Sequence, residues 1–382
     1  MGDLPVRIGI IAERLGLGAG GLETYERGLL QGLADLDSGH EYEVYCSSRQ
    51  AVETSLPANH HYSIQPVCTK SAWLRFAVGL PLKLMKTQVD LVHACFVSPL
   101  IIPQRLVVTL HDLFPFSHPR HMPCPIELRL KILQHMSLRR SVRIIANSET
   151  TKQAIINRFH IDPARVKVIH LGVDKRYHPS VDDGLGPLLN GYDLPEKYIL
   201  YVGRIEPRKN IGRLLQAYRW LRINKKIPHR LVLVGRIEPW GRRMIDKFSS
   251  FLGQDVLFSG YVPLALLPHV YRGADALVFP SLLEGFGLPP LEAMACGIPV
   301  VASRIPAICE VLQDAAMLVD PHDQKGLEAA LQQILEDERL RQELRERGLK
   351  RAALFSWTET ARRTLQVYEE ATGKDNSGAW QR

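Results

Sequence analysis

Long apolar runs and closely paired cysteines are missing from this chain of 382 residues. Its longest apolar stretch, residues 74–85, is broken by Arg75, Pro81 and Lys83, so no window holds the roughly 20 apolar residues that a membrane-spanning helix needs. The six cysteines form no C-x-x-C pair, which argues against a zinc ribbon or a disulfide scaffold. The first residues do not resemble a signal peptide. We therefore expect a cytoplasmic protein.

Acidic residues are scarce in one part of the chain. Residues 71–180 carry 16 basic and 6 acidic side chains, whereas residues 1–70 carry 5 and 9, and residues 181–382 carry 27 and 25. Such a concentration of positive charge favours an anionic partner: a membrane surface, a phosphate-bearing substrate or a nucleic acid. A solvated helix face is the plain alternative.

Short apolar runs alternate with amphipathic stretches of helix length along the whole chain. The expected strands are residues 6–12, 42–46, 91–94, 105–110, 143–146, 166–169, 198–202, 230–234, 256–259, 276–279, 299–302 and 316–319. The expected helices are residues 22–36, 126–140, 153–159, 211–222, 242–252, 289–295, 324–336 and 356–371. Strands that are apolar throughout, each followed by a helix, indicate parallel sheets of the doubly wound α/β type.

A boundary is expected within residues 171–194, which are rich in glycine and proline. We place one domain at residues 1–180 and a second at 181–355, followed by a helix at 356–374 and a frayed tail at 375–382. Ligands of doubly wound sheets bind beyond the carboxyl ends of the strands. Two such sheets facing a central cleft would let two substrates meet, which favours a transferase.

A glycine-rich segment, Gly16-Leu-Gly-Ala-Gly20-Gly21, follows the first expected strand and formally spells G-x-G-x-x-G. It makes a poor dinucleotide fingerprint, because the second strand does not end in the acidic residue that such sites require. We interpret it as a loop before a helix, with backbone amides that could accept a phosphate or a sugar oxygen. A turn without a ligand is the alternative.

Two further strand ends carry polar residues. His111-Asp112 ends one strand ahead of a proline-containing loop, where a histidine is placed to face a ligand. Gly203-Arg204 ends another, and Lys209-Asn210 follows just before a helix. Two cations beside a helix N-terminus are suited to hold a diphosphate. A structural His-Asp pair and a solvated basic loop are the respective alternatives.

The most specific segment runs from Phe279 to Ser303 and contains Glu284-Gly-Phe-Gly-Leu-Pro-Pro-Leu-Glu292. A buried strand ends at Phe279, a glycine-rich loop follows, and a helix begins near the two prolines. Carboxylates accept hydrogen bonds from sugar hydroxyls, and a helix N-terminus binds phosphate. Together these features suit a sugar nucleotide.

At these motifs the chain resembles the retaining glycosyltransferases of family 4, also called group 1, and in particular their mannosyltransferase-like members. The resemblance covers nearly the whole sequence. It implies the GT-B architecture, with two Rossmann-like domains and a C-terminal helix that crosses back to the N-terminal domain. The N-terminal domain would bind the acceptor and the C-terminal domain the nucleotide sugar.

The resemblance also implies roles for individual residues. Arg204 and Lys209, next to Gly203, would bind the donor diphosphate, and Glu292 the ribose. Glu284, with the loop amides of Gly285, Phe286, Gly287 and Leu288, would orient the transferred sugar. His111 would contact that sugar near the reacting carbon, and Gly20 and Gly21 would close over the phosphate or the acceptor. The catalytic set is therefore His111, Glu284, Arg204 and Lys209.

Neither a cofactor nor a metal is expected, because the cations and helix dipoles would stabilise the leaving diphosphate. Asp35-Leu-Asp37 formally spells D-x-D but lies at a helix end, away from the other motifs, and we assign it to the surface. The resemblance implies same-face substitution with a donor phosphate oxygen assisting. A double displacement would need a carboxylate beneath the anomeric carbon, and no residue is an obvious candidate.

In this family the basic segment 71–143 belongs to the acceptor domain. We therefore expect a peripheral contact with an anionic membrane and a glycan or lipid-linked acceptor in polysaccharide or glycolipid biosynthesis. GDP-mannose is the first donor candidate, followed by UDP-glucose or another UDP-sugar. The alternatives are an NAD-dependent oxidoreductase that uses the glycine-rich loop, a nucleic-acid-binding protein and an inactive scaffold. No nucleic-acid-binding module is present to support the second of these.

Overall fold

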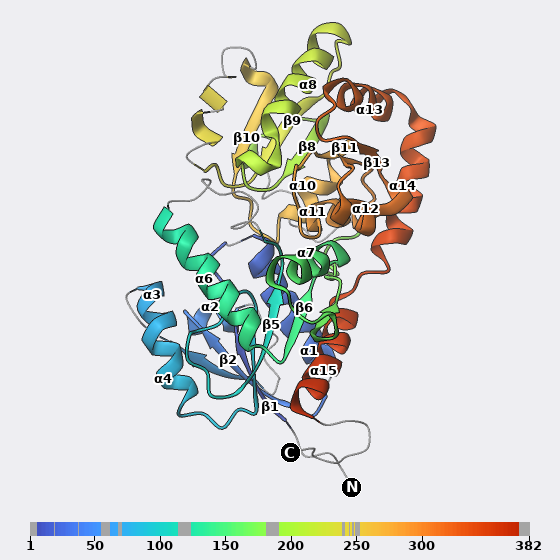
Figure 1. Ribbon diagram of the computed structural model, residues 1–382. Coiled ribbons are helices and arrows are strands. Elements are labelled where there is room, and N and C mark those ends of the chain that lie inside the picture. The colour runs from blue at the N-terminus through green and yellow to red at the C-terminus, as the bar shows by residue number, and fades with distance from the viewer. Residues whose placement is uncertain are drawn as a thin grey trace. The chain divides into compact units, whose positions relative to one another are not determined.

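The computed structural model describes residues 6–18, 20–36, 38–54, 62–67, 71–113, 124–180, 191–238, 241–243, 245–246, 248 and 253–373. The chain forms two compact units (Figure 1). Unit 1 contains the chain up to Gly172 and again from Ser356 onward, and unit 2 contains Val173–Phe355. The sequence placed the first boundary at residue 180.

A seven-stranded parallel sheet with the order β3-β2-β1-β4-β5-β6-β7 forms the centre of unit 1. Its strands are β1 (Arg7–Ile11), β2 (Glu41–Cys46), β3 (Tyr62–Pro66), β4 (Leu91–Ala94), β5 (Arg105–Leu110), β6 (Arg143–Ala146) and β7 (Val166–Val168). The helical segments are α1 (Gly21–Leu36), α2 (Arg49–Glu53), α3 (Ala72–Leu74), the π-helical η1 (Arg75–Gly79), α4 (Leu80–Leu84), α6 (Cys124–Arg140), α7 (Glu149–Phe159), η2 (Pro163–Arg165) and α15 (Trp357–Thr372).

Unit 2 is built on a six-stranded parallel sheet with the order β10-β9-β8-β11-β12-β13. Its strands are β8 (Tyr198–Val202), β9 (Arg230–Val234), β10 (Val256–Gly260), β11 (Ala276–Phe279), β12 (Val300–Ser303) and β13 (Met317–Val319). The helical segments are η4 (Pro207–Lys209), α8 (Ile211–Asn224), η5 (Gly253–Asp255), α10 (Leu267–Arg272), α11 (Leu288–Ala295), α12 (Pro306–Leu312), η6 (Gln313–Ala315), α13 (Gln324–Glu336) and α14 (Glu338–Ala352).

The prediction of two doubly wound parallel sheets is confirmed. Strands β4, β8, β11 and β12 are buried along their whole length, as expected for strands covered on both faces. Strand β3 and helices α2, α3, α4, α10, α12 and α14 were not predicted. The expected helix at 242–252 falls largely outside the described residues, as does Asp37 of the D-x-D sequence. Within the described part of the chain, no helix is both long and apolar enough to cross a membrane.

The C-terminal helix α15 returns to unit 1 and packs beside α1, as predicted (Figure 1). Ser356 caps it by accepting a hydrogen bond from the Glu359 amide at 3.1 Å. Glycines make room for this contact. A Cβ on Gly28 would lie 2.1 Å from the Trp357 ring, and one on Gly32 would lie 2.3 Å from the Trp357 carbonyl oxygen. The close approach of the two helices therefore depends on small residues in α1.

We predict that Gly28→Ala lowers the free energy of unfolding by about 1–3 kcal/mol, because the added methyl group overlaps the Trp357 ring. The midpoint of thermal unfolding measures the change. Gly191→Ala is the matched control, since no atom lies within 4 Å of a Cβ built there. Equal midpoints for the two variants would contradict the packing of α15 on α1.

Candidate functional site

The order of strands in unit 2 reverses between β8 and β11. In an open parallel sheet, ligands bind beyond the carboxyl ends of the strands at such a reversal. Arg204, Arg208 and Lys209 follow β8, and Glu284 follows β11. The predicted donor residues on these two segments therefore border the place where the topology expects a ligand.

Glu284 is held between two cations. Its Oε1 accepts a hydrogen bond from Lys209 Nζ at 2.5 Å, and its Oε2 accepts one from Arg208 Nη1 at 3.2 Å. All three side chains are largely buried. Lys209 Nζ also lies 5.1 Å from the centroid of the Phe279 ring at the end of β11. The cluster thus joins the loops that follow β8 and β11.

Burial shapes the charges of this cluster. Burial opposes ionisation of Glu284, but Lys209 and Arg208 outweigh it, and the pKa of Glu284 lies below its ordinary value. Burial, together with the neighbouring Arg208, lowers the pKa of Lys209. Glu284 is therefore an ionised carboxylate, able to accept hydrogen bonds from hydroxyl groups.

Arg204 occupies a more exposed place at the same strand end. Its Nη1 lies 3.4 Å from Glu238 Oε1, and both side chains are open to solvent. Gly203 before it packs closely against the end of β9. A Cβ on Gly235 would lie 2.0 Å from the Gly203 carbonyl oxygen, and the Gly235 φ of 141° also favours glycine. The two glycines let neighbouring strand ends converge beside Arg204.

The loop from Gly285 to Leu288 is buried and leads into α11. Gly287 caps this helix with a φ of 107°, and a Cβ there would lie 2.5 Å from Ile308 Cδ1. The Phe286 ring packs edge-on against Phe355, with their centroids 6.0 Å apart. This phenylalanine thus anchors the loop through its side chain.

Glu292 lies in α11 in a different environment from Glu284. It is 6% exposed, and its Oε2 accepts a hydrogen bond from the Tyr271 hydroxyl at 2.7 Å. Burial raises the pKa of Glu292 to about 7, while hydrogen bonds from Tyr271 and Tyr177 partly oppose this. Glu292 therefore changes its charge near neutral pH.

His111 follows β5 in unit 1. Its Nε2 lies 3.1 Å from the carbonyl oxygen of Cys95, which follows β4, so Nε2 carries the proton that is donated. The Tyr25 ring meets the imidazole edge-on, with centroids 4.5 Å apart. Burial lowers the pKa of His111 to about 4, partly opposed by the bond to Cys95. The imidazole is therefore neutral at physiological pH, with Nδ1 as its acceptor nitrogen.

A buried chain of polar groups lies behind His111. The Tyr25 hydroxyl and His93 Nε2 each lie 2.8 Å from the Thr109 hydroxyl, and His93 Nδ1 lies 2.6 Å from the Tyr368 hydroxyl of α15. Burial lowers the pKa of His93 to about 3. This neutral chain fixes the Tyr25 ring against His111.

The glycine-rich loop is tied to α1. Glu26 accepts a hydrogen bond from the Arg14 amide at 2.8 Å, and Glu23 accepts one from the Gly16 amide at 3.1 Å. Burial raises the pKa of Glu26 to about 8. The Arg14 and Gly16 amides are therefore not free for a ligand, which removes Gly16 from the loop amides that could accept a phosphate or a sugar oxygen. Gly20 and Gly21 have open space where a Cβ would be.

Two family models cover most of the chain. Residues 190–351 match "Glycosyl transferases group 1" and residues 19–177 match "Glycosyltransferase Family 4". The O-antigen chain mannosyltransferase B of Escherichia coli is 34% identical over 269 residues, which cover 70% of each chain. The chain belongs to the group 1 glycosyltransferases. The serotype-specific mannosyltransferase WbdA of Escherichia coli is 30% identical over 274 residues, covering 70% of this chain but 34% of the much longer relative.

Solved structures share the fold of this glycosyltransferase. Sucrose-phosphate synthase from Thermosynechococcus elongatus has a TM-score of 0.75 at 23% identity, covering 97% of this chain and 100% of that one. Anabaena Alr3699/HepE in complex with UDP-glucose has a TM-score of 0.75 at 19% identity, covering 95% and 99%. At these identities the likeness concerns the fold, and it confirms the predicted GT-B class.

The predicted site residues of the glycosyltransferase divide between its units. Lys209 and Glu284 are in contact, and Arg204 shares the strand end of Lys209. His111, Gly20 and Gly21 belong to unit 1. The motifs did not single out Arg208, Tyr271 or the chain from Tyr25 to Tyr368, because partners distant in sequence create those contacts. Among the described residues, no cluster of three or more His, Cys, Asp or Glu could hold a metal ion.

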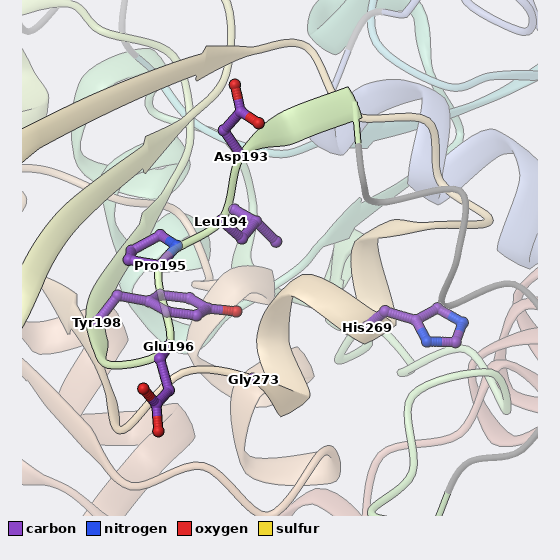
Figure 2. Close-up of a pocket in the computed structure, with 7 residues that line it drawn as sticks. All are labelled: Asp193, Leu194, Pro195, Glu196, Tyr198, His269 and Gly273. Carbon is purple, nitrogen blue, oxygen red and sulfur yellow. The ribbon is translucent and has the colours of Figure 1, made fainter.

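A pocket of about 590 Å³ lies at the other end of β8, where Tyr198 begins the strand. Its lining residues are Asp193, Leu194, Pro195, Glu196, Tyr198, His269 and Gly273 (Figure 2). Figure 2 shows the carboxylates of Asp193 and Glu196 pointing in opposite directions, and His269 pointing away from Tyr198. These polar groups do not converge on one ligand. The pocket lies at the opposite end of β8 from the predicted donor residues Arg204 and Lys209.

We predict that Glu292→Gln reduces the dependence of stability on pH. The carboxyl is ionised above about pH 4.5 in the unfolded chain but only above about pH 7 in the folded one, so folding becomes less favourable as the pH rises between these values. Wild type should lose about 2–4 kcal/mol over this range from Glu292, and the neutral glutamine should remove that loss. Urea unfolding at pH 5 and pH 8 measures both proteins.

The stability that Glu284 contributes should depend on pH in the opposite direction, and Glu284→Gln tests this. It leaves Lys209 buried without its partner, and should cost about 3–5 kcal/mol at pH 7. Because the folded pKa of Glu284 is depressed, wild type keeps this stabilisation above pH 4.5 and loses it only as the pH falls through the folded value. A Glu292→Gln variant with the pH dependence of wild type would contradict the environment described for that carboxyl.

Proposed function

We propose that this glycosyltransferase transfers a hexose from a sugar nucleotide to a glycan or lipid-linked acceptor in polysaccharide or glycolipid biosynthesis. The cluster of Lys209, Glu284 and Arg208 at the strand reversal carries the proposal. The likeness to an O-antigen chain mannosyltransferase supports GDP-mannose as the donor. UDP-glucose or another UDP-sugar comes next, supported by the structural relative solved with UDP-glucose.

Each group in the second unit has a task suited to its chemistry. Lys209 and Arg204 bind the diphosphate, and with the N-terminus of α11 they stabilise the negative charge that grows as the sugar–phosphate bond breaks. No metal or cofactor is needed for this. Glu284, an ionised acceptor, orients the sugar through its hydroxyl groups, and the loop from Gly285 to Leu288 borders it. Glu292 accepts hydrogen bonds from the ribose.

The first unit supplies groups near the reacting carbon and the acceptor. His111 contacts the transferred sugar through its neutral imidazole, and Gly20 and Gly21 close over the phosphate or the acceptor. The acceptor hydroxyl attacks the face from which the diphosphate leaves, and a donor phosphate oxygen takes its proton, so the anomeric configuration is retained. A sugar trapped covalently on an enzyme side chain would instead establish a double displacement.

The enzyme works at the cytoplasmic face of an anionic membrane in this proposal. Several large apolar side chains on or directly after α3, η1, α4 and α6 are exposed: Trp73, Leu74, Val78, Leu82, Met85, Leu128 and Ile132. Basic side chains accompany them, and the Arg129 guanidinium lies 5.6 Å from the Trp73 ring centroid. Exposed apolar and basic side chains together suit the boundary between lipid headgroups and acyl chains.

We predict that one nucleotide family raises the thermal stability of the enzyme in the presence of EDTA. The panel contains GDP, GDP-mannose, UDP, UDP-glucose, UDP-N-acetylglucosamine and NAD. At about 100 times its dissociation constant, a ligand should stabilise the protein by about 2.7 kcal/mol. Turnover in EDTA, with the product anomer assigned by NMR, then tests metal independence and retention.

Lys209→Ala should lose most of the donor-induced shift, because it removes the cation beside Glu284. Lys225→Ala is its matched control, since Lys225 lies at the other end of α8 and stacks on Trp220. Stabilisation by NAD alone, or by no nucleotide, would overturn the proposed function.

We predict that the protein floats with vesicles of anionic lipid and less with neutral ones, and that salt weakens the association. Replacing Trp73 and Leu82 together with serine should reduce flotation, because less apolar area enters the bilayer. Leu354→Ser, which alters an even more exposed apolar residue of unit 2, should have no effect. Absence of wild-type flotation at low salt would remove the membrane contact from the proposal.

A further inference from the structure

Arg208 is fixed from three sides. Its Nε donates to Glu206 Oε1 at 2.6 Å, while its Nη1 lies 3.2 Å from both Glu284 Oε2 and the Leu283 carbonyl oxygen. Its own carbonyl oxygen accepts the Leu282 amide at 2.7 Å. Both the side chain and the backbone of Arg208 are therefore tied to the loop that carries Glu284.

Lys209 is held differently. Its ammonium contacts the other oxygen of the same carboxylate and lies beside the Phe279 ring, which does not fix the direction of a cation as a hydrogen bond does. A lysine ammonium on a flexible stem can turn toward a new anion, whereas a planar guanidinium tied at several points keeps its place. The two cations of the cluster therefore differ in freedom.

Donor binding would change the electrostatic surroundings of Glu284. When Lys209 turns to the diphosphate, the carboxylate loses one of its two cations while it remains buried. A buried carboxylate without a partner takes up a proton, and a protonated carboxyl is a weaker acceptor for sugar hydroxyls. Glu284 needs a second cation that the donor does not draw away.

We propose that Arg208 is the positioning residue that keeps Glu284 ionised and oriented while Lys209 pairs with the donor diphosphate. Glu206 holds Arg208 in that place through its Nε. This inference rests on the proposed function and extends it to a residue that acts on the sugar through Glu284.

The groups around Glu284 agree with the assignment of Lys209 to the diphosphate and Arg208 to the carboxylate. Lys209, Arg208 and Glu206 come from the loop after β8, and Tyr201 comes from β8 itself. The Tyr201 hydroxyl donates to the Arg204 carbonyl oxygen at 2.9 Å, and burial raises the pKa of Tyr201 so that it stays neutral. Once Lys209 is engaged by phosphate, Arg208 is the remaining cation of this set in contact with the carboxylate.

Arg208→Gln tests the inference through the sugar part of the donor. Calorimetry compares GDP with GDP-mannose, or UDP with UDP-glucose if the uridine pair stabilises wild type. The affinity for the nucleoside diphosphate should change by less than about threefold, because Lys209 and Arg204 remain. The affinity for the sugar nucleotide should fall about tenfold, as for a weakened hydrogen bond to a charged group.

The pH profile of kcat/KM gives a second measurement that loss of structure alone would not move. Removing Arg208 should raise the pKa of Glu284, so activity should fail at a higher pH as the solution is acidified. The acid limb should shift upward by about one unit or more. Arg208→Lys keeps the positive charge but lacks the planar guanidinium, so it should shift the acid limb less. It also offers a second variant if Arg208→Gln folds poorly.

Arg222→Gln is the matched control. It breaks another arginine–carboxylate pair of unit 2, with Asp255 at 2.7 Å, far along α8 from the cluster. It should leave both nucleotide affinities and the acid limb unchanged. The inference would be overturned, with the proposed function intact, if Arg208→Gln and Arg208→Lys lost affinity equally for the nucleoside diphosphate and the sugar nucleotide and the acid limb of kcat/KM did not move. Failure of wild type to bind any nucleotide would overturn the proposed function, and the inference with it.

Discussion

Burying an ionised carboxylate is costly unless cations pair with it. Because Glu284 is buried and ionised, the loop that follows β8 has to bring cations to the loop that follows β11. The turn Pro207–Lys209 places Arg208 and Lys209 against the same carboxylate, that of Glu284. Asn210 stabilises that turn, since it adopts the left-handed conformation and donates from Nδ2 to the carbonyl oxygens of Pro280 and Pro321. One amide thus binds together the loops that follow β8, β11 and β13.

Glu284, in the loop after β11, and Glu292, in α11, differ in charge because their neighbours differ. Glu284 has cations and remains charged, whereas Glu292 meets the hydroxyls of Tyr271 and Tyr177 and its pKa rises to about 7. Tyrosine donors satisfy an acceptor without neutralising its charge. Glu292 is therefore able to exchange a tyrosine donor for a ligand hydroxyl at little electrostatic cost, whereas Glu284 depends on the cations Arg208 and Lys209 for its charge.

The sequence predicted the elements that appear as short, continuous apolar runs. It missed elements that carry no clear apolar pattern of their own. Strands β4, β5, β6, β8, β9 and β11 have the expected bounds because each is a short buried run. Strand β3 has an irregular pattern of burial, and α14 is so highly charged that no apolar periodicity marks it. The roles assigned to Lys209 and Glu284 came from a recognised motif. The part played by Arg208 required the fold, because Glu284 and Leu283 lie more than 70 residues away in the chain.

The C-terminal helix has a chemical consequence as well as a structural one. Tyr368 reaches from α15 to His93, and through Thr109 to Tyr25, whose ring lies against His111. All members of the chain are buried and neutral, so a cation in place of any of them would be disfavoured by desolvation. The same burial keeps His111 neutral. In the proposed function His111 faces a carbon that develops positive character, and a neutral imidazole there would avoid the repulsion that an imidazolium would add.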